Sequence, residues 1–220
     1  MNFLGKVGEV AQTSIHLLSN QIEMGKDKLK FNSKTIHGGQ NPDKGYGAVM
    51  PPVYLTSTYA QSTPGGHQGY EYSRTHNPTR TALEASLASI EDGAYGFCFG
   101  SGMAAIDAVI KLLSPGDEVI STNDLYGGSY RIFTKIFESF GIGFHFVDMQ
   151  DPANVAAKIN AKTKLIWVET PTNPMMNVVD IEAMHKLVAD QDILLAVDNT
   201  FASPYPVSYT HLTLPTILLV

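Results

Sequence analysis

The sequence predicts an α/β protein in which helices flank a mostly parallel sheet. Between residues 77 and 198, short apolar segments alternate with longer segments whose apolar residues recur at every third or fourth position. That alternation is typical of βαβ units, whose strands run parallel. Polar residues directly follow the last two apolar segments, as expected where the strands of such a sheet end beside a ligand.

The first regular helix is expected to begin at Pro78. Asn77 is a good N-cap, and proline is favoured at the first helical position. Apolar residues mark one face along positions 83–90, and Gly93 ends the helix. The apolar run at residues 95–99 then predicts a strand.

The later elements continue the alternation up to residue 197. Pro115, Gly116 and Asp117 form a turn signal, and Gly141 stops a helix. Helices are expected at residues 101–113, 129–140, 152–159 and 181–189, and strands at residues 118–121, 144–147, 165–168 and 193–197.

The composition changes on both sides of this regular part, which we place at residues 81–205. Residues 1–34 are polar, and we interpret them as a loosely attached N-terminal extension. Residues 35–80 are rich in Gly, Pro, Tyr, Thr and Ser, which predicts an arm of extended chain and loops that contacts a neighbouring subunit. The apolar residues of 206–220 follow neither the helical nor the strand periodicity, and we expect this segment not to be native sequence.

The bulk properties exclude several classes of protein. The net charge of −6 and the scattered Lys and Arg residues argue against a nucleic-acid partner. No segment reaches the ~18 apolar residues of a membrane span. A single cysteine, Cys98, excludes an intrachain disulfide and suits a reducing compartment, so we expect a cytoplasmic protein. The histidines lack the spacing of a metal site.

Three polar residues at the ends of predicted strands are candidates for a binding site. Asp198 follows the apolar run 193–197, Glu169 follows the strand before it, and Asn173 lies in the next loop. A carboxylate at the exit of a buried strand is costly and usually has a partner. The alternatives are that Asp198 is a turn or cap residue and that Asn173 is a turn residue ahead of Pro174.

Two further groups could bind an anion. Ser101, Gly102 and Met103 open a helix directly after a predicted strand, where free backbone N–H groups attract phosphate. Tyr72 and Arg74 in the arm can donate hydrogen bonds to phosphate oxygens. An ordinary strand-to-helix turn and an exposed surface pair are the respective alternatives.

Tyr126 is a candidate of a different kind. It precedes Gly127 and Gly128, and an aromatic ring in such a place can stack on a flat ligand. The alternative is a tyrosine packed under a glycine turn.

Six motifs in a characteristic order give a family resemblance. Residues 35–205 resemble the N-terminal and central part of the Cys/Met-metabolism pyridoxal phosphate enzymes. This family includes cystathionine γ-synthase, γ-lyase and β-lyase, methionine γ-lyase and the O-acylhomoserine sulfhydrylases. The motifs are YEYSR (70–74), NPT (77–79), SGMAA (101–105), DLYGG (124–128), ETPTNP (169–174) and VDNT (197–200).

The resemblance implies the large domain of a type I pyridoxal phosphate enzyme and a role for most of the candidates. Asp198 pairs with the pyridine nitrogen, Tyr126 stacks on the ring and takes part in proton transfer, and Asn173 binds the phenolic oxygen. Ser101, Gly102 and Met103 bind the phosphate, and Glu169 orients other groups rather than touching the cofactor. The resemblance also implies that Tyr72 and Arg74 reach the phosphate of the neighbouring subunit in a homotetramer built as a dimer of dimers.

The sequence departs from the family in one decisive respect. The family's Schiff-base lysine lies downstream of the Asp198 position, and this chain has no lysine beyond Lys186. The C-terminal domain with its substrate-binding arginine is also missing. We therefore expect a partial large domain that is inactive as a 220-residue chain.

Within the family, YEYSR and the segment 99–105 favour cystathionine γ-synthase or γ-lyase, which would act on a sulfur amino acid or an O-acylhomoserine. The β-lyase, methionine γ-lyase and sulfhydrylase activities stay open, as does a noncatalytic binding fragment of the same fold. The absence of a Gly-x-Gly-x-x-Gly motif counts against a dinucleotide-binding protein.

Overall fold

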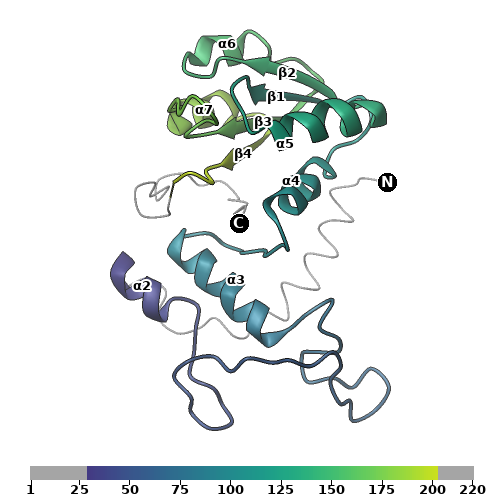
Figure 1. The fold of residues 1–220 in the computed structure, drawn as a ribbon, viewed down its shortest axis with the longest axis vertical. Helices are drawn as coiled ribbons and strands as arrows, with labels where there is room; N and C mark the ends of the chain where they lie inside the picture. Colours follow the sequence, from purple (N-terminus) through teal and green to yellow (C-terminus); the bar gives the residue numbers. More distant parts are fainter. Residues whose placement is uncertain (1–28, 203–220) are drawn as a thin grey trace. The chain divides into compact units, whose positions relative to one another are not determined.

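The computed structural model describes residues 29–202, and these residues form two compact units (Figure 1). One unit ends at Ile90 and the other begins at Glu91. The expected extension up to residue 28 and the tail at 206–220 lie outside the described residues. Among the described residues, no helix has the length and apolar character needed to cross a membrane.

The described part of the first unit, residues 29–90, contains two helices and a long irregular segment. Helix α2 spans Phe31–His37 and helix α3 spans Pro78–Ile90. The predicted cap of α3 is confirmed, because Asn77 Oδ1 accepts a hydrogen bond of 2.8 Å from the Thr79 amide. The unit therefore places α3 together with the segment that we expect to be an arm.

Helix α2 was not expected from the sequence, and it spans the boundary that we placed after residue 34. A close backbone approach fixes its packing on α3. Gly39 has φ +68°, and a Cβ there would lie 2.3 Å from the carbonyl oxygen of Ala85 in α3. Only glycine allows both features, so the loop after α2 depends on this residue.

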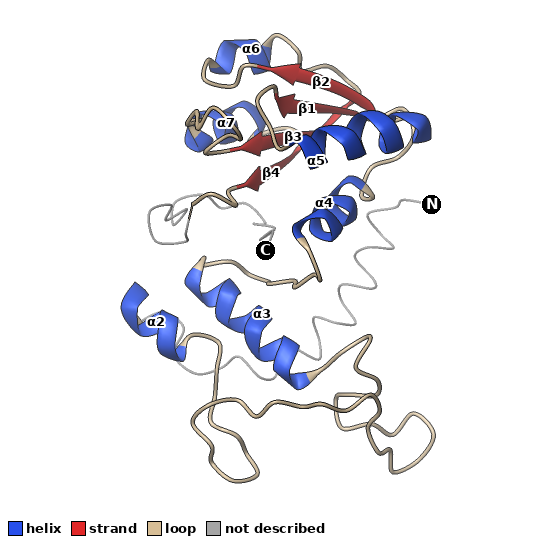
Figure 2. Cartoon of the chain, in the orientation of Figure 1, coloured by secondary structure: helices blue, strands red, loops and turns tan. Residues whose placement is uncertain are grey.

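The second unit contains a four-stranded parallel sheet, as predicted (Figure 2). Its strands are β1 (Glu118–Thr122), β2 (Gly143–Val147), β3 (Thr163–Glu169) and β4 (Leu194–Asp198). They lie in the order β2-β1-β3-β4, and every pair is parallel. The carboxyl ends of all four strands therefore lie at one edge.

The expected strand at residues 95–99 is wrong. These residues form no strand in the described structure, and Tyr95, Phe97 and Phe99 are exposed. A strand exists only where another strand satisfies its backbone groups. An apolar pattern predicts the extended conformation without revealing whether a partner is available.

The helices of the second unit follow their predicted positions. They are α4 (Gly102–Ile110), α5 (Gly127–Ile132), α6 (Pro152–Ala156) and α7 (Ile181–Val188). Helix α5 continues through a π-helical turn at Phe133–Phe137 and a 3₁₀ turn at Glu138–Phe140. Gly141 ends this segment with φ 84°, as expected for a C-terminal glycine.

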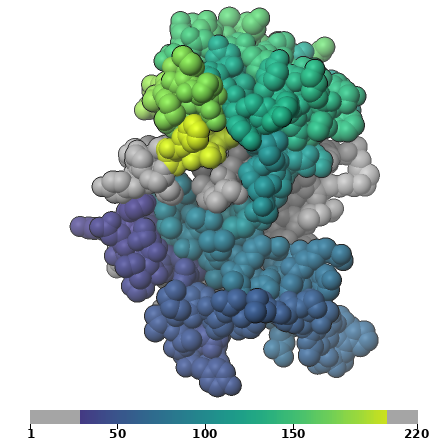
Figure 3. All heavy atoms as spheres, in the orientation of Figure 1, coloured from purple at the N-terminus to yellow at the C-terminus, as the bar shows by residue number. Residues whose placement is uncertain are grey.

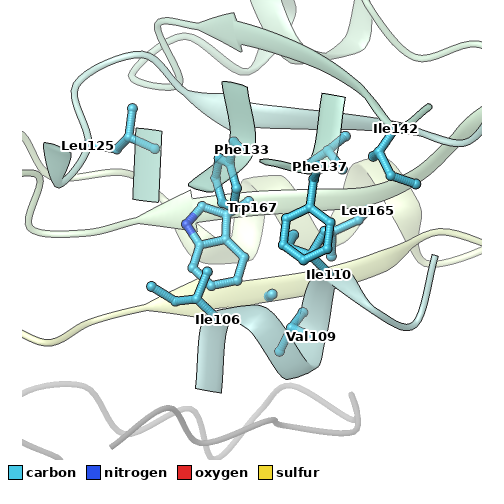
Figure 4. Packing of buried hydrophobic residues seen from close by; sticks show 11 residues of the cluster. Ile106, Val109, Ile110, Leu125, Phe133, Phe137, Ile142, Leu165 and Trp167 are labelled. Atoms are coloured by element: carbon cyan, nitrogen blue, oxygen red, sulfur yellow. The ribbon is translucent and has the colours of Figure 1, made fainter. Parts of the chain in front are cut away.

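Hydrophobic clusters cover both faces of the sheet. Side chains alternate along β3, so Leu165 and Trp167 pack on one face while Ile166 and Val168 pack on the other. Helix α4 and the segment after α5 cover the first face (Figure 4), and α6 and α7 cover the second. Strand β4 is an edge strand, and the end of the described chain reaches the surface (yellow in Figure 3).

Charged side chains at the amino edge of the sheet are paired. Glu118 at the start of β1 accepts a hydrogen bond of 2.9 Å from Asn160 and lies 2.7 Å from His145 Nε2. These contacts, first that of Asn160, lower the pKa of the Glu118 carboxyl. Lys164 Nζ lies 2.9 Å from Asp192, also at this edge.

Candidate active site

A pair of carboxylates lies at the carboxyl edge of the sheet. Glu169 and Asp198 end β3 and β4 and are register partners, and they are only 4% and 6% exposed. Asp198 Oδ1 accepts hydrogen bonds from the backbone N–H (3.2 Å) and the hydroxyl (2.6 Å) of Thr200. This local turn, one of the roles expected for Asp198, engages Oδ1, and no bond to Oδ2 is seen within residues 29–202.

The Glu169 carboxylate holds the loop after β1. Its two oxygens accept hydrogen bonds of 3.0 and 2.9 Å from the backbone N–H of Tyr126. Burial is the main cause that raises the pKa of Glu169 to about 7, and Asp198 and Asp124 add to it. The backbone N–H groups of Tyr126 and Asn173 act in the opposite direction. Glu169 therefore holds the backbone of Tyr126 in place, and its expected role of orienting other groups rather than touching the cofactor stays a prediction.

Tyr126 presents its ring at the start of α5. The ring lies against Gly128, where an added Cβ would come within 2.2 Å of Tyr126 Cε1. Tyr126 is 46% exposed. The ring therefore packs against Gly128 and is also accessible to a flat ligand. The glycine packing expected as the alternative for Tyr126 is therefore present, and stacking on a ligand stays a prediction.

A third carboxylate, Asp124, connects this loop to the loop after β3. Its Oδ2 accepts hydrogen bonds from the hydroxyl of Thr172 and from the backbone N–H of Met175, the latter at 3.0 Å. The two donors flank Asn173, which is half-buried. Asp124 thus fixes the loop that carries Asn173.

We had not predicted this role of Asp124. The signal that could have indicated it is a carboxylate shortly after the predicted strand at 118–121, the same placement that made Asp198 a candidate.

Helix α4 packs on one face of the sheet, and its packing beside Trp167 locates it relative to the carboxyl edge. Figure 4 shows Ile106, in the middle of α4, beside Trp167, whereas Val109 lies farther along toward Phe137. Trp167 lies near the carboxyl end of β3, two residues before Glu169, so Ile106 in α4 lies toward that end of the strand.

Ser101 is the N-cap of α4. The Ser101 hydroxyl accepts a hydrogen bond of 3.2 Å from the Ala104 amide. Gly102 and Met103 follow as the first helical residues, whose N–H groups have no partner within the helix.

Tyr72 and Arg74 belong to the first unit. The Arg74 guanidinium carbon lies 5.0 Å from the centroid of the Tyr72 ring, which is a cation–π contact. Tyr72 also bridges to Thr58 in the same unit. Their expected contact with a phosphate in a neighbouring subunit stays a prediction.

The carboxyl edge suits a ligand that brings its own positive charge. The lysines nearest the strands, Lys162 and Lys164, lie at the opposite edge beside Glu118 and Asp192. Lys111 and Lys186 pair with acidic residues on their own helices. Residues 29–202 contain no group of three or more His, Cys, Asp or Glu side chains arranged to hold a metal ion.

Comparison with known proteins identifies the family. Residues 32–214 match the model of the Cys/Met metabolism PLP-dependent enzymes. The chain is 48% identical over 178 residues to cystathionine β-lyase of Coxiella burnetii, covering 80% of this chain and 46% of that protein. It is 48% identical over 175 residues to a probable cystathionine γ-synthase of Herpetosiphon aurantiacus, covering 80% and 55%.

The fold has a solved counterpart. The structure of cystathionine γ-lyase from Lactobacillus plantarum, complexed with L-serine, has a TM-score of 0.77 and 48% sequence identity over 80% of this chain and 46% of that chain. The chain thus spans about half the length of the relatives that it matches. The match to the family model nevertheless covers most of this chain, and the protein belongs to the Cys/Met metabolism PLP-dependent enzyme family.

Proposed function

We propose that the protein is a pyridoxal phosphate enzyme of sulfur amino acid metabolism, of the cystathionine γ-synthase or γ-lyase type. The observation that carries this proposal is the buried Asp198 carboxylate at the carboxyl edge, which has no cationic partner among the bonds of residues 29–202. A protonated pyridine nitrogen would supply that partner. The accessible ring of Tyr126, whose backbone N–H binds the neighbouring Glu169, supports the same ligand.

The residues present fit the cofactor. Asp198 would hold a proton on the ring nitrogen, because a nearby negative charge favours the charged form of the base. Tyr126 would stack on the ring, and Asn173 would donate to the phenolic oxygen. The amides of Gly102 and Met103, with the Ser101 cap, would bind the phosphate.

Bound pyridoxal phosphate supplies an electron sink for the carbanion formed at the α-carbon of an amino acid. The protein's share is to bury the Asp198 side chain at the carboxyl edge and to hold the Tyr126 loop through Glu169. In the homotetramer that we propose, Tyr72 and Arg74 would complete the phosphate site of the neighbouring subunit. That arrangement is a dimer of dimers.

The choice of a γ-type reaction rests on the YEYSR motif and on residues 99–105. Relatives named β-lyase, γ-synthase and γ-lyase are each 48% identical to the chain, so identity does not separate them. Cystathionine β-lyase, methionine γ-lyase and O-acylhomoserine sulfhydrylase activities are therefore the alternatives. The substrate would be a sulfur amino acid or an O-acylhomoserine.

A binding experiment tests the proposal on the 220-residue chain. We expect pyridoxal phosphate to raise the midpoint of thermal unfolding in a saturable manner, because a ligand that binds only the folded state stabilises it. NAD at the same concentration should leave the midpoint unchanged. Stabilisation by NAD alone would contradict the proposal and favour a dinucleotide-binding protein.

Borohydride treatment of the same sample distinguishes two modes of binding. Because the chain has no lysine beyond Lys186, we expect its mass to stay unmodified after reduction at stoichiometric cofactor. A stoichiometric adduct on one lysine would show that a covalent site exists within these residues.

A further inference from the structure

Glu169 occupies a central position between the parts of the proposed site. It ends β3, lies next to Asp198 across the sheet, and binds the backbone N–H of Tyr126 through both carboxylate oxygens. The N–H of Asn173 also acts on its carboxyl. One buried side chain thus binds the loop that carries the stacking residue, and the N–H of the residue expected at the phenolic oxygen lowers its pKa.

The charges around Glu169 are all of one sign. Within residues 29–202, the charged groups that act on its carboxyl are Asp198 and Asp124, and the remaining contacts are backbone N–H groups. Two carboxylates in register at a buried edge repel each other when both are ionised. Proton uptake by Glu169 relieves this repulsion, whereas a cation beside Asp198 favours release of that proton from Glu169.

We propose that Glu169 is a positioning residue that sets the pose of Tyr126 and the charge around Asp198, and that it does so by exchanging a proton with solvent. Ionised Glu169 accepts the Tyr126 amide with both oxygens and adds negative charge beside the pyridine nitrogen. Protonated Glu169 keeps one acceptor oxygen for that amide and leaves Asp198 as the sole charge of the pair. This inference rests on the proposed function, because Tyr126 and Asp198 matter as cofactor contacts.

The Glu169→Gln variant is the matched test, because glutamine keeps the shape and one acceptor oxygen of protonated Glu169. Because the pKa of Glu169 is about 7, its carboxyl is mostly protonated at pH 5.5 and mostly ionised at pH 8.5, and binding is measured at both pH values. At pH 5.5 the two proteins should bind pyridoxal phosphate equally. At pH 8.5 the variant should bind roughly tenfold more weakly, the effect of one charge-assisted hydrogen bond. A loss of equal size at both pH values would overturn the inference, since it indicates a merely structural role.

An NMR titration without cofactor separates this inference from the proposed function. We expect the ¹H–¹⁵N signals of Tyr126 and Asn173 to titrate with a midpoint near 7 in the wild-type chain and to stay constant in Glu169→Gln. The exposed Glu138→Gln variant should titrate like the wild type, which controls for the loss of a carboxylate.

The possible outcomes are distinct. Absence of the titration in the wild type, or its persistence in Glu169→Gln, would overturn the role of Glu169. A titration that follows Glu169 in a chain that does not bind pyridoxal phosphate would support the positioning role and overturn the proposed function instead.

Discussion

Replacement of Asp198 by asparagine is expected to lower the affinity for pyridoxal phosphate by about 10- to 100-fold, the effect of losing one hydrogen bond to a charged group. Asparagine keeps an oxygen for the Thr200 hydroxyl, which Oδ1 of Asp198 binds at 2.6 Å, so the local turn should survive. What the variant loses is the negative charge that stabilises a protonated pyridine nitrogen. Equilibrium dialysis of both proteins at pH 8 measures the difference.

Asp192 offers a control near the other end of the same strand. It is exposed and pairs with Lys164, so Asp192→Asn should bind the cofactor as the wild type does. Equal affinities for Asp198→Asn and Asp192→Asn would show that Asp198 does not contact the cofactor. The circular dichroism of each variant should match that of the wild type, which excludes misfolding as the cause.

Replacement of Phe133 by alanine is expected to lower the free energy of unfolding by about 3–5 kcal/mol, the usual cost of truncating a buried aromatic side chain. Phe133 is fully buried in the cluster shown in Figure 4. Its ring stacks on Phe144 at 4.8 Å and meets Trp167 edge-on at 5.6 Å between centroids. Urea unfolding followed by circular dichroism measures the loss.

Phe140 is the matched control for this substitution. It lies at the end of the same helical segment but is 59% exposed, so Phe140→Ala should cost less than about 1 kcal/mol. Similar urea midpoints of unfolding for the two variants would contradict the packing of Phe133 in the hydrophobic cluster on the sheet.

The parallel sheet was predictable because its signals are local and repeated. Each strand is a short apolar run, and several helices begin at a side-chain cap, such as Asn77 for α3 and Ser101 for α4. The alternation of the two patterns then restricts the sheet to parallel pairing. Asp198 and Glu169 could be placed at one edge by the same logic, since the carboxyl ends of parallel strands lie together.

The features that were missed depend on contacts between distant residues. Residues 95–99 have the apolar character of a strand, but pairing is a property of the sheet. Helix α2 depends on the close approach of Gly39 to Ala85, which no local pattern reveals. Likewise, the hydrogen bond that the Thr172 hydroxyl donates to Asp124 joins two loops that are far apart in the chain.

The two edges of the sheet differ in how their charges are satisfied. At the amino edge, Glu118 has Asn160 and His145 as partners, and its pKa is lowered. At the carboxyl edge, Glu169 has other carboxylates as neighbours, and its pKa is raised to about 7. Perturbed carboxylates of this second kind cluster at functional sites, which favours the carboxyl edge as the site.

The most direct test of this account is a map of the backbone amides that respond to pyridoxal phosphate. In a ¹H–¹⁵N titration of the 220-residue chain, we expect saturable shifts at the carboxyl edge and at the start of α4. The amides concerned are those of Gly102, Met103, Tyr126, Asn173 and Asp198. Shifts centred on Glu118 and His145 at the amino edge, or no saturable shifts at all, would contradict the proposed cofactor site.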